Sequence, residues 1–273
     1  FSKKGVEFDD KITQYLKENK IKEIIGMDNN LCIEAGECGK RSIDIMLGAL
    51  DGLDYEMNFL SYEKPFGVGY SIVSYTNLKK NGKKLHKDIL DQKNKKNQER
   101  IENEDIYVKL ARKTINKWVK EKEKLSIDKL DLPKEMLNKR AGVFVSIKNS
   151  SGLRGCIGTT GKGMEKNIAL EIRRNAIQAC SNDPRFPEVK PFELDDLKIS
   201  VDILKESKPV DDLNELDPQK YGVIVSYKHK KGLLLPRLDG IDTVDKQLNI
   251  ALKKAGINKN SDYDVEKFEV IRH

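Results

Sequence analysis

Apolar and polar residues follow two different periods in the first third of the chain. Apolar residues recur three and four positions apart, for example at Ile43, Met46 and Leu47, and this spacing predicts helices. Residues 57–62 (MNFLSY) and 68–75 (VGYSIVSY) resemble strands, and the EKPFG between them predicts a hairpin turn. We therefore expect a small helical segment followed by a β-hairpin.

The remainder of the chain mixes short strands with helices and lacks the strand–helix–strand rhythm of a parallel sheet. Helices are predicted from Ile106 to Val119, from Met164 to Ser181 and over 244–255, because apolar residues recur at helical spacing. Strands are predicted at GVFVSI (142–147), LRGCIG (153–158), DLKISVDIL (196–204), YGVIV (221–225), GLLLP (232–236) and KFEVIR (267–272). This order indicates an α+β fold, an antiparallel sheet with flanking helices.

The stretch from Leu153 to Gly163, LRGCIGTTGKG, combines a cation, a thiol, two hydroxyls and four glycines. Strict alternation along its strand would place Arg154 and Cys156 on one face, so we expect them to share one solvent-reachable hollow. They are the candidate catalytic pair. The alternative is that Cys156 is a small buried residue and Arg154 a surface residue.

Further candidates for binding a substrate or partner flank this pair. Gly155 and Gly158 qualify because glycines allow a ligand to approach the main chain closely. Thr159, which carries one of the two hydroxyls, follows them directly. Asp183 and Arg185 lie in NDPRFPEVKPFE, a proline-rich loop after the following helix. A helix of about 17 residues spans about 25 Å, so the sequence leaves open whether that loop returns to the glycine-rich turn.

The string LRGCIGT closely resembles the signature of the AMMECR1 family. Further matches follow in the family's order over roughly residues 103–272, at EDIYVKLARKTI (104–115), NDPRFPEV (182–189), DLKISVDIL, YGVIV, GLLLP and KKAGI (253–257). The resemblance implies an α+β domain over 103–273 whose hallmark residues are Leu153 to Gly158. It also implies similarity to the A component of the AmmeMemoRadiSam system, which acts beside a Memo-like B component and a radical SAM enzyme.

The first 77 residues resemble the C-terminal part of Memo-like and class III extradiol dioxygenase (LigB-type) domains. The matching strings are GVEFD (5–9), GECGKRS (36–42) and FGVGY (66–70). The fold class expected here is a partial α/β segment of that kind, without the metal-binding histidines, since no histidine precedes His86. In Memo-like proteins the cysteine matching Cys38 lines a pocket derived from the iron site, so we assign it as a metal ligand only in an intact domain; otherwise it packs beneath the hairpin.

Composition and charge narrow the remaining classes of function. Of 273 residues 38% are hydrophobic, and no apolar run is long enough for a membrane span. The four cysteines form no CxxC pair, so we expect reduced thiols, a cytoplasmic location and no cofactor in this chain. Nearly all of the net charge of +7 lies in residues 78–100, within the stretch 78–102 that we interpret as a basic, solvated linker; nucleic-acid binding is therefore disfavoured.

Together these features predict an AMMECR1 domain fused to a Memo-like remnant. It would bind a small-molecule substrate or a partner for a radical SAM protein through the LRGCIG loop. Three alternatives stay open: a metal-dependent oxygenase of the extradiol type, a basic nucleic-acid adaptor, and covalent catalysis by Cys156, for which no general base can be named. Whether the chain is part of a longer protein is also open, since it begins with Phe1.

Overall fold

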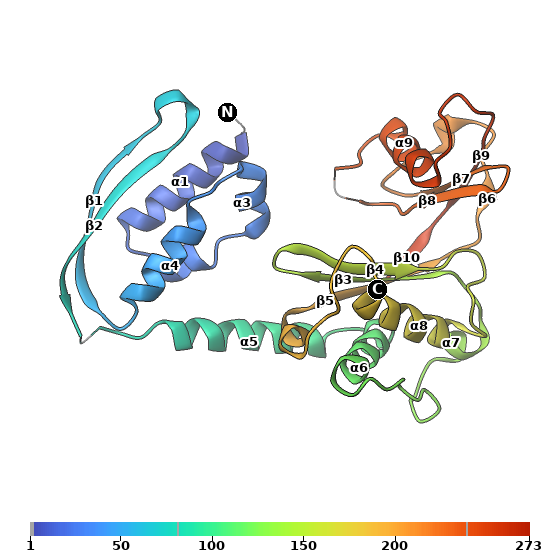
Figure 1. Cartoon of the computed structure of the whole chain (residues 1–273), viewed down its shortest axis with the longest axis horizontal. Helices are drawn as coiled ribbons and strands as arrows, with labels where there is room; N and C mark the ends of the chain where they lie inside the picture. The colour runs from blue at the N-terminus through green and yellow to red at the C-terminus, as the bar shows by residue number, and fades with distance from the viewer. Residues whose placement is uncertain (1–2, 81, 239) are drawn as a thin grey trace. The chain divides into compact units, whose positions relative to one another are not determined.

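The protein is described by a computed structural model that covers residues 3–80, 82–238 and 240–273. It divides into two compact units, residues 1–100 and 101–273 (Figure 1). The sequence placed the start of the second domain at residue 103, close to this division. Each unit has its own apolar core, and each is described separately below.

Four helices and a hairpin build the first unit. The helices are α1 (Lys3–Lys17), α2 (Ile21–Ile25), α3 (Asn29–Ala35) and α4 (Lys40–Leu50), and the hairpin strands are β1 (Asp54–Glu63) and β2 (Tyr70–Lys79). The core lies between the helices and the hairpin and includes Phe8, Ile12, Leu16, Leu31 and Leu47. The helical start and the hairpin predicted from the sequence are both confirmed.

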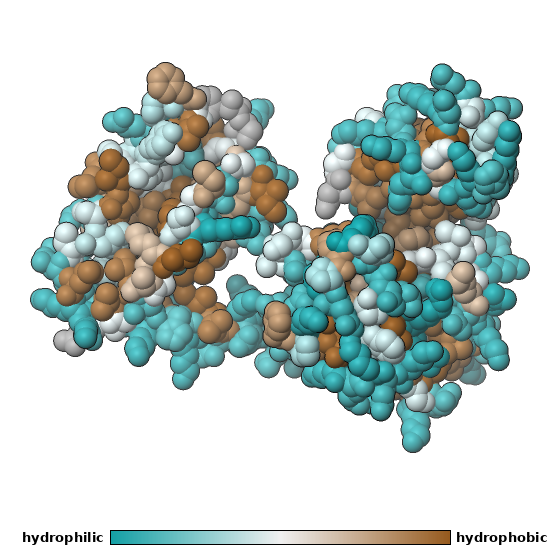
Figure 2. Space-filling model, viewed as in Figure 1, coloured by the Kyte–Doolittle hydropathy of each residue, from teal (hydrophilic) through white to brown (hydrophobic). Residues whose placement is uncertain are grey.

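The hairpin leaves apolar side chains at the surface of this unit. Those exposed are Leu60, Phe66, Val68, Tyr70, Ile72 and Leu78. Figure 2 shows hydrophobic residues on the surface of this unit, over the hairpin. Several exposed apolar side chains on one hairpin are typical of a face that packs against another segment or protein.

The stretch expected as a solvated linker is helical over much of its length. Helix α5 runs from His86 to Glu102, and none of its residues is buried. Its sequence is dominated by Lys, Asn, Gln and acidic residues and has few apolar positions, so hydrophobic periodicity could not predict it.

The first sheet of the second unit has four antiparallel strands in the order β10-β5-β3-β4. They are β3 (Val143–Asn149), β4 (Gly152–Gly158), β5 (Lys198–Leu204) and β10 (Val270–Arg272). Helices α6 (Ile106–Glu121) and α8 (Ile168–Ser181) cover one face (Figure 1). The core on that face includes Val143, Val145, Ile147, Ile172 and Val201.

A second four-stranded sheet, β6-β9-β7-β8, lies on the other side of the first sheet from α6 and α8 (Figure 1). Its strands are β6 (Lys208–Pro209), β7 (Gly222–Tyr227), β8 (Lys230–Leu234) and β9 (Asp264–Phe268), with helix α9 (Val244–Ala255) packed against β7 and β8. A small cluster joins the two sheets: Leu204, Ile224, Leu235, Phe268 and Val270.

The predicted α+β class is confirmed, since every strand pair in the described residues is antiparallel and helices flank the sheets. Three details differ from the sequence prediction. The helix predicted from Met164 begins only at Ile168, the first residue of α8. KFEVIR was expected to be one strand, but the strand is interrupted at Glu269. The two parts, β9 and β10, therefore join different sheets. The unit also contains short helical segments, α7 (Lys134–Asn138), η2 (Pro191–Asp196) and η3 (Leu213–Glu215), and in the first unit η1 (Pro65–Gly67) forms the hairpin turn.

Candidate functional site

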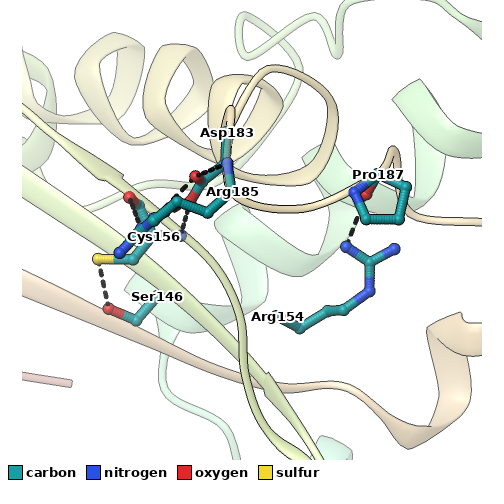
Figure 3. A network of polar contacts seen from close by, with 6 residues as sticks. All are labelled: Ser146, Arg154, Cys156, Asp183, Arg185 and Pro187. Atoms are coloured by element: carbon teal, nitrogen blue, oxygen red, sulfur yellow. Dashed lines mark hydrogen bonds and ion pairs between the residues drawn. The ribbon is translucent and has the colours of Figure 1, made fainter.

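A β-bulge in β4 decides which side chains meet. Ile147 of β3 pairs with Gly155 and the next residue, Lys148, pairs with Leu153, which leaves Arg154 without a cross-strand partner. One extra residue reverses the facing of every side chain beyond it. The prediction that Arg154 and Cys156 share one hollow is therefore wrong, because strict alternation does not hold across the bulge. Figure 3 shows the two side chains pointing apart.

Arg154 is buried and connects β4 to the proline-rich loop through hydrogen bonds. Its Nε and Nη2 donate to the two carboxylate oxygens of Glu193 at 2.7 and 3.0 Å, and its Nη1 donates to the carbonyl of Pro187 at 2.7 Å. The guanidinium holds the pKa of Glu193 below its usual range, chiefly through these hydrogen bonds. All three contacts are internal, so the expected catalytic role of Arg154 has no geometric support.

Cys156 lies half-buried on the face of the first sheet opposite α6 and α8. Its Sγ is 3.2 Å from the hydroxyl of Ser146. The register pairs Ser146 with Cys156 on one side and with Ser200 on the other. Neighbouring strands are about 4.8 Å apart, so two hydroxyls and a thiol form a polar row across β5, β3 and β4.

The proline-rich loop does return to Cys156, which the sequence had left open. The carboxylate of Asp183 accepts a hydrogen bond from the Cys156 amide at 2.8 Å, and Arg185 Nη2 donates to the Cys156 carbonyl at 3.1 Å (Figure 3). Because β4 is an edge strand, this pair satisfies the backbone groups that a neighbouring strand would otherwise satisfy.

Asp183 and Arg185 are also paired with each other. Arg185 Nε and Nη2 donate to the two carboxylate oxygens of Asp183 at 2.9 and 2.7 Å. The hydrogen bonds from the Arg185 side chain, and then those from the Cys156 and Arg185 amides, lower the pKa of the buried Asp183 to about 2. The carboxylate in turn raises the pKa of Arg185. The Asp183 side chain is 1% exposed and that of Arg185 is 54% exposed, so Arg185 alone is open to a ligand.

The other predicted binding residues serve packing and loop structure. A Cβ added at Gly155 would lie 2.2 Å from the Ala179 carbonyl oxygen, and one at Gly158 would lie 2.2 Å from the Phe144 ring. Thr159 is buried and donates to Glu171 at 2.8 Å. Glu171 also accepts backbone hydrogen bonds from residues 164 and 165, which holds the glycine-rich turn against α8.

A pocket of about 500 Å³ lies between the Cys156 face of the first sheet and the β8–α9 end of the second. Its floor carries Ser146, Cys156 and Ser200, and Leu153 and Leu235 are among its apolar lining. Its cationic side chains are Lys148, Arg185, Lys198, Arg237, Lys254 and Arg272. Among the described lining residues the one acid is Asp202, which is 2% exposed and accepts hydrogen bonds from Arg272 at 2.7 and 3.0 Å.

Sequence reasoning found Cys156 and Arg185 of this pocket but missed its lysines. Lys198, Ser200 and Asp202 alternate with apolar residues in the predicted strand 196–204, and a solvated strand face has the same pattern. The missing information was the register that sets β3 beside β5 and the packing that brings α9 close. Arg154, Gly155, Gly158 and Thr159 do not line the pocket.

The remaining cysteines differ in their surroundings. Burial raises the pKa of Cys180 to about 12 and also raises the pKa of Cys32, so both are predominantly thiols at neutral pH. Cys38 is exposed just before α4, which contradicts the expectation that it packs beneath the hairpin. Across 3–80, 82–238 and 240–273, no group of three His, Cys, Asp or Glu side chains is arranged to hold a metal ion.

Fold and pocket together define an α+β domain in which two antiparallel sheets enclose a cationic pocket. The AMMECR1 family matches residues 108–273, and this chain belongs to that family. A relative from Thermotoga maritima is 48% identical over 172 residues, 62% of this chain and 98% of the relative. The crystal structure of PH0010, an uncharacterised protein from Pyrococcus horikoshii, matches with a TM-score of 0.56 and 28% identity, covering 61% of this chain and 88% of that one.

One relative also matches the first unit. Protein CA_C1420 of Clostridium acetobutylicum is 43% identical over 272 residues, 98% of this chain. The chain spans only 57% of that relative's own length. Within the described parts of the chain, none of the helices has the length and apolar character needed to cross a bilayer.

Proposed function

We propose that the second unit is a binding domain that receives an anionic small molecule in the pocket over Cys156. The observation that carries this proposal is the charge of the lining, in which, among the described residues, six cationic side chains face one acid. Concave surfaces lined by one sign of charge raise the local concentration of ligands of the opposite sign.

Most of this charge is not neutralised by the protein. Arg185 is paired with Asp183, and Arg272 with Asp202. Two more cations donate hydrogen bonds to neutral groups, Arg237 to the Gln219 carbonyl and Lys254 to the Leu233 carbonyl. With Lys148 and Lys198, four positive charges in the described pocket lack a carboxylate partner, and an anion would supply it.

The contacts of Cys156 support binding more than independent catalysis. A nucleophilic thiol needs a neighbouring base, and the polar groups around Cys156 in the described structure are a serine hydroxyl, the Asp183 carboxylate and a guanidinium. With a pKa of about 2, Asp183 is too weak a base at neutral pH, and its oxygens already accept from Arg185 and two amides. The chemistry on the bound molecule would then come from a partner.

We further propose that this partner is the radical SAM enzyme of an AmmeMemoRadiSam-type system and that residues 1–77 are the C-terminal part of a Memo-like domain. Support comes from the resemblance of GECGKRS and FGVGY to that domain, from the exposed apolar face of the β1–β2 hairpin, and from the greater length of the Clostridium relative. Cys38 would be a metal ligand only in the intact domain. Gel filtration of this chain mixed with the radical SAM enzyme tests this assignment. Separate elution of the chain and the enzyme would contradict it.

Anion binding itself is tested by isothermal titration with citrate as the probe. We expect one saturable site whose affinity falls as salt is raised, because the attraction is electrostatic. Lys254→Ala should weaken binding by about threefold to tenfold, as expected for the loss of one charge near a partly exposed site. Lys253→Ala is the matched control, since Lys253 is exposed on the same helix but does not line the pocket. Equal effects of the two changes, or no saturable binding, would refute the proposal.

A further inference from the structure

Two lysines stand directly opposite each other on the floor of the pocket. The register pairs Lys148 of β3 with Lys198 of β5, and both side chains are exposed and line the pocket. Directly opposite residues on one sheet face have Cβ atoms about 5 Å apart, and like charges in this position destabilise the sheet. The fold therefore carries a local repulsion at this point.

Acids that would relieve this repulsion are found elsewhere on the same unit but not here. Two other lysines of the unit are paired, Lys205, which directly follows β5, with Glu269, and Lys267 of β9 with Glu215. On the far side of Lys148 the register places Leu153, which is apolar. Within the described chain no ion pair or side-chain hydrogen bond is formed by Lys148 or Lys198, so the two ammonium groups are open to a ligand.

We propose that the Lys148–Lys198 pair binds the dianionic phosphate group of a phosphate monoester. This inference rests on the proposed anion-binding function and specifies its ligand class. Two ammonium groups, each with three donors, match both the charge of a dianion and its several acceptor oxygens. A carboxylate carries one charge and is matched best by the planar fork of an arginine, whereas the Lys148–Lys198 pair supplies two point charges.

The rest of the pocket fits the remainder of such a molecule. The row of Ser200, Ser146 and Cys156 runs alongside the lysine pair, one side-chain row further along the same face, and supplies further polar groups. Leu153, Leu235 and Leu238 give the pocket an apolar wall for an organic substituent. A volume of about 500 Å³ suits a ligand of small-molecule size rather than inorganic phosphate alone.

Three probes with the same aromatic body test the ligand class: phenyl phosphate, benzenesulfonate and benzoate. The sulfonate is tetrahedral but singly charged, so it separates shape from charge. By titration calorimetry at pH 7.5 we expect phenyl phosphate to bind at least about tenfold tighter than either monoanion, and this preference should shrink at pH 5, below the second pKa of the phosphate at about 6.

Variants locate the site on the intact chain. Lys148→Met and Lys198→Met keep an unbranched side chain and should each remove most of the preference for phosphate, whereas Lys253→Met should leave it unchanged. If all three probes bind alike and Lys254→Ala weakens them all, the pocket binds anions but the phosphate inference is wrong. If the two lysine variants keep the same preference for phenyl phosphate as the unchanged chain, the inference is also wrong. If no probe binds, the proposed function fails as well.

Discussion

Arg154→Ala should destabilise the second unit, in contrast to the effect expected of a catalytic side chain. The substitution removes three hydrogen bonds, two to Glu193 and one to the Pro187 carbonyl. Glu193 would keep its charge at a site where its side chain is only 17% exposed. The proline-rich loop would also lose its attachment to β4.

The size of the effect follows from the burial of the pair. Removing one partner of a fully buried ion pair costs about 3–5 kcal/mol, because the other charge stays behind without compensation. The Arg154 and Glu193 side chains are 11% and 17% exposed, so water offsets part of this, and we expect a loss of about 2–4 kcal/mol. For a unit of this size, that corresponds to a fall in Tm of about 4–15 °C.

Fluorescence of Trp118 during urea unfolding provides the assay. It is the only tryptophan in the sequence and packs against the core of the second unit, so it reports on that unit. A double-mutant cycle with Glu193→Ala should give a coupling free energy of about 1 kcal/mol or more. At low temperature the folded Arg154→Ala variant should still bind citrate, because Arg154 does not line the pocket. Unchanged stability together with lost binding would refute this account and restore Arg154 as a binding residue.

Three further predictions concern the same unit. Because the pKa of Asp183 is about 2 when folded and about 3.9 when unfolded, its contribution of about 2–3 kcal/mol is complete above the unfolded value and is lost as pH falls through the folded one; Asp183→Asn should flatten the acid limb of the Trp118 stability curve, and identical curves would contradict this. Gly155→Ala should cost about 1–3 kcal/mol, since the new Cβ would lie 2.2 Å from the Ala179 carbonyl oxygen; a variant with an unshifted urea midpoint would show that β4 and α8 are not so close. Lys198→Met should raise stability by about 0.2–1 kcal/mol through relief of the repulsion with Lys148, and a loss of stability would speak against that repulsion.

The order of the elements was largely predictable from local patterns. Helix α9 begins and ends at the predicted residues 244 and 255, because an apolar stripe ends there at Gly256 in the left-handed conformation. Strands β3, β5 and β7 likewise lie within a residue or two of their predicted positions. Such elements depend on neighbours in sequence, which a single sequence contains.

The arrangement of the site was not predictable in the same way. A bulge depends on the register with another strand, so alternation alone gave the wrong facing for Arg154 relative to Cys156. The approach of Asp183 to the Cys156 amide depends on how a proline-rich loop folds back along an edge strand. The cationic lining comes from β3, β5, β10, α9 and two loops, and only tertiary structure brings these segments together.

The claim that the surroundings of Cys156 attract anions is tested most directly by the thiol itself. Alkylation rates with anionic iodoacetate and neutral iodoacetamide can be measured at Cys156 and, as an internal control, at the exposed Cys38 by peptide mass spectrometry. At low salt we expect the ratio of the iodoacetate rate to the iodoacetamide rate to be about tenfold higher at Cys156 than at Cys38, because a cationic lining concentrates the anionic reagent. This excess should disappear at high salt and shrink in the Lys148→Met/Lys198→Met variant. Equal ratios at the two cysteines would contradict the account.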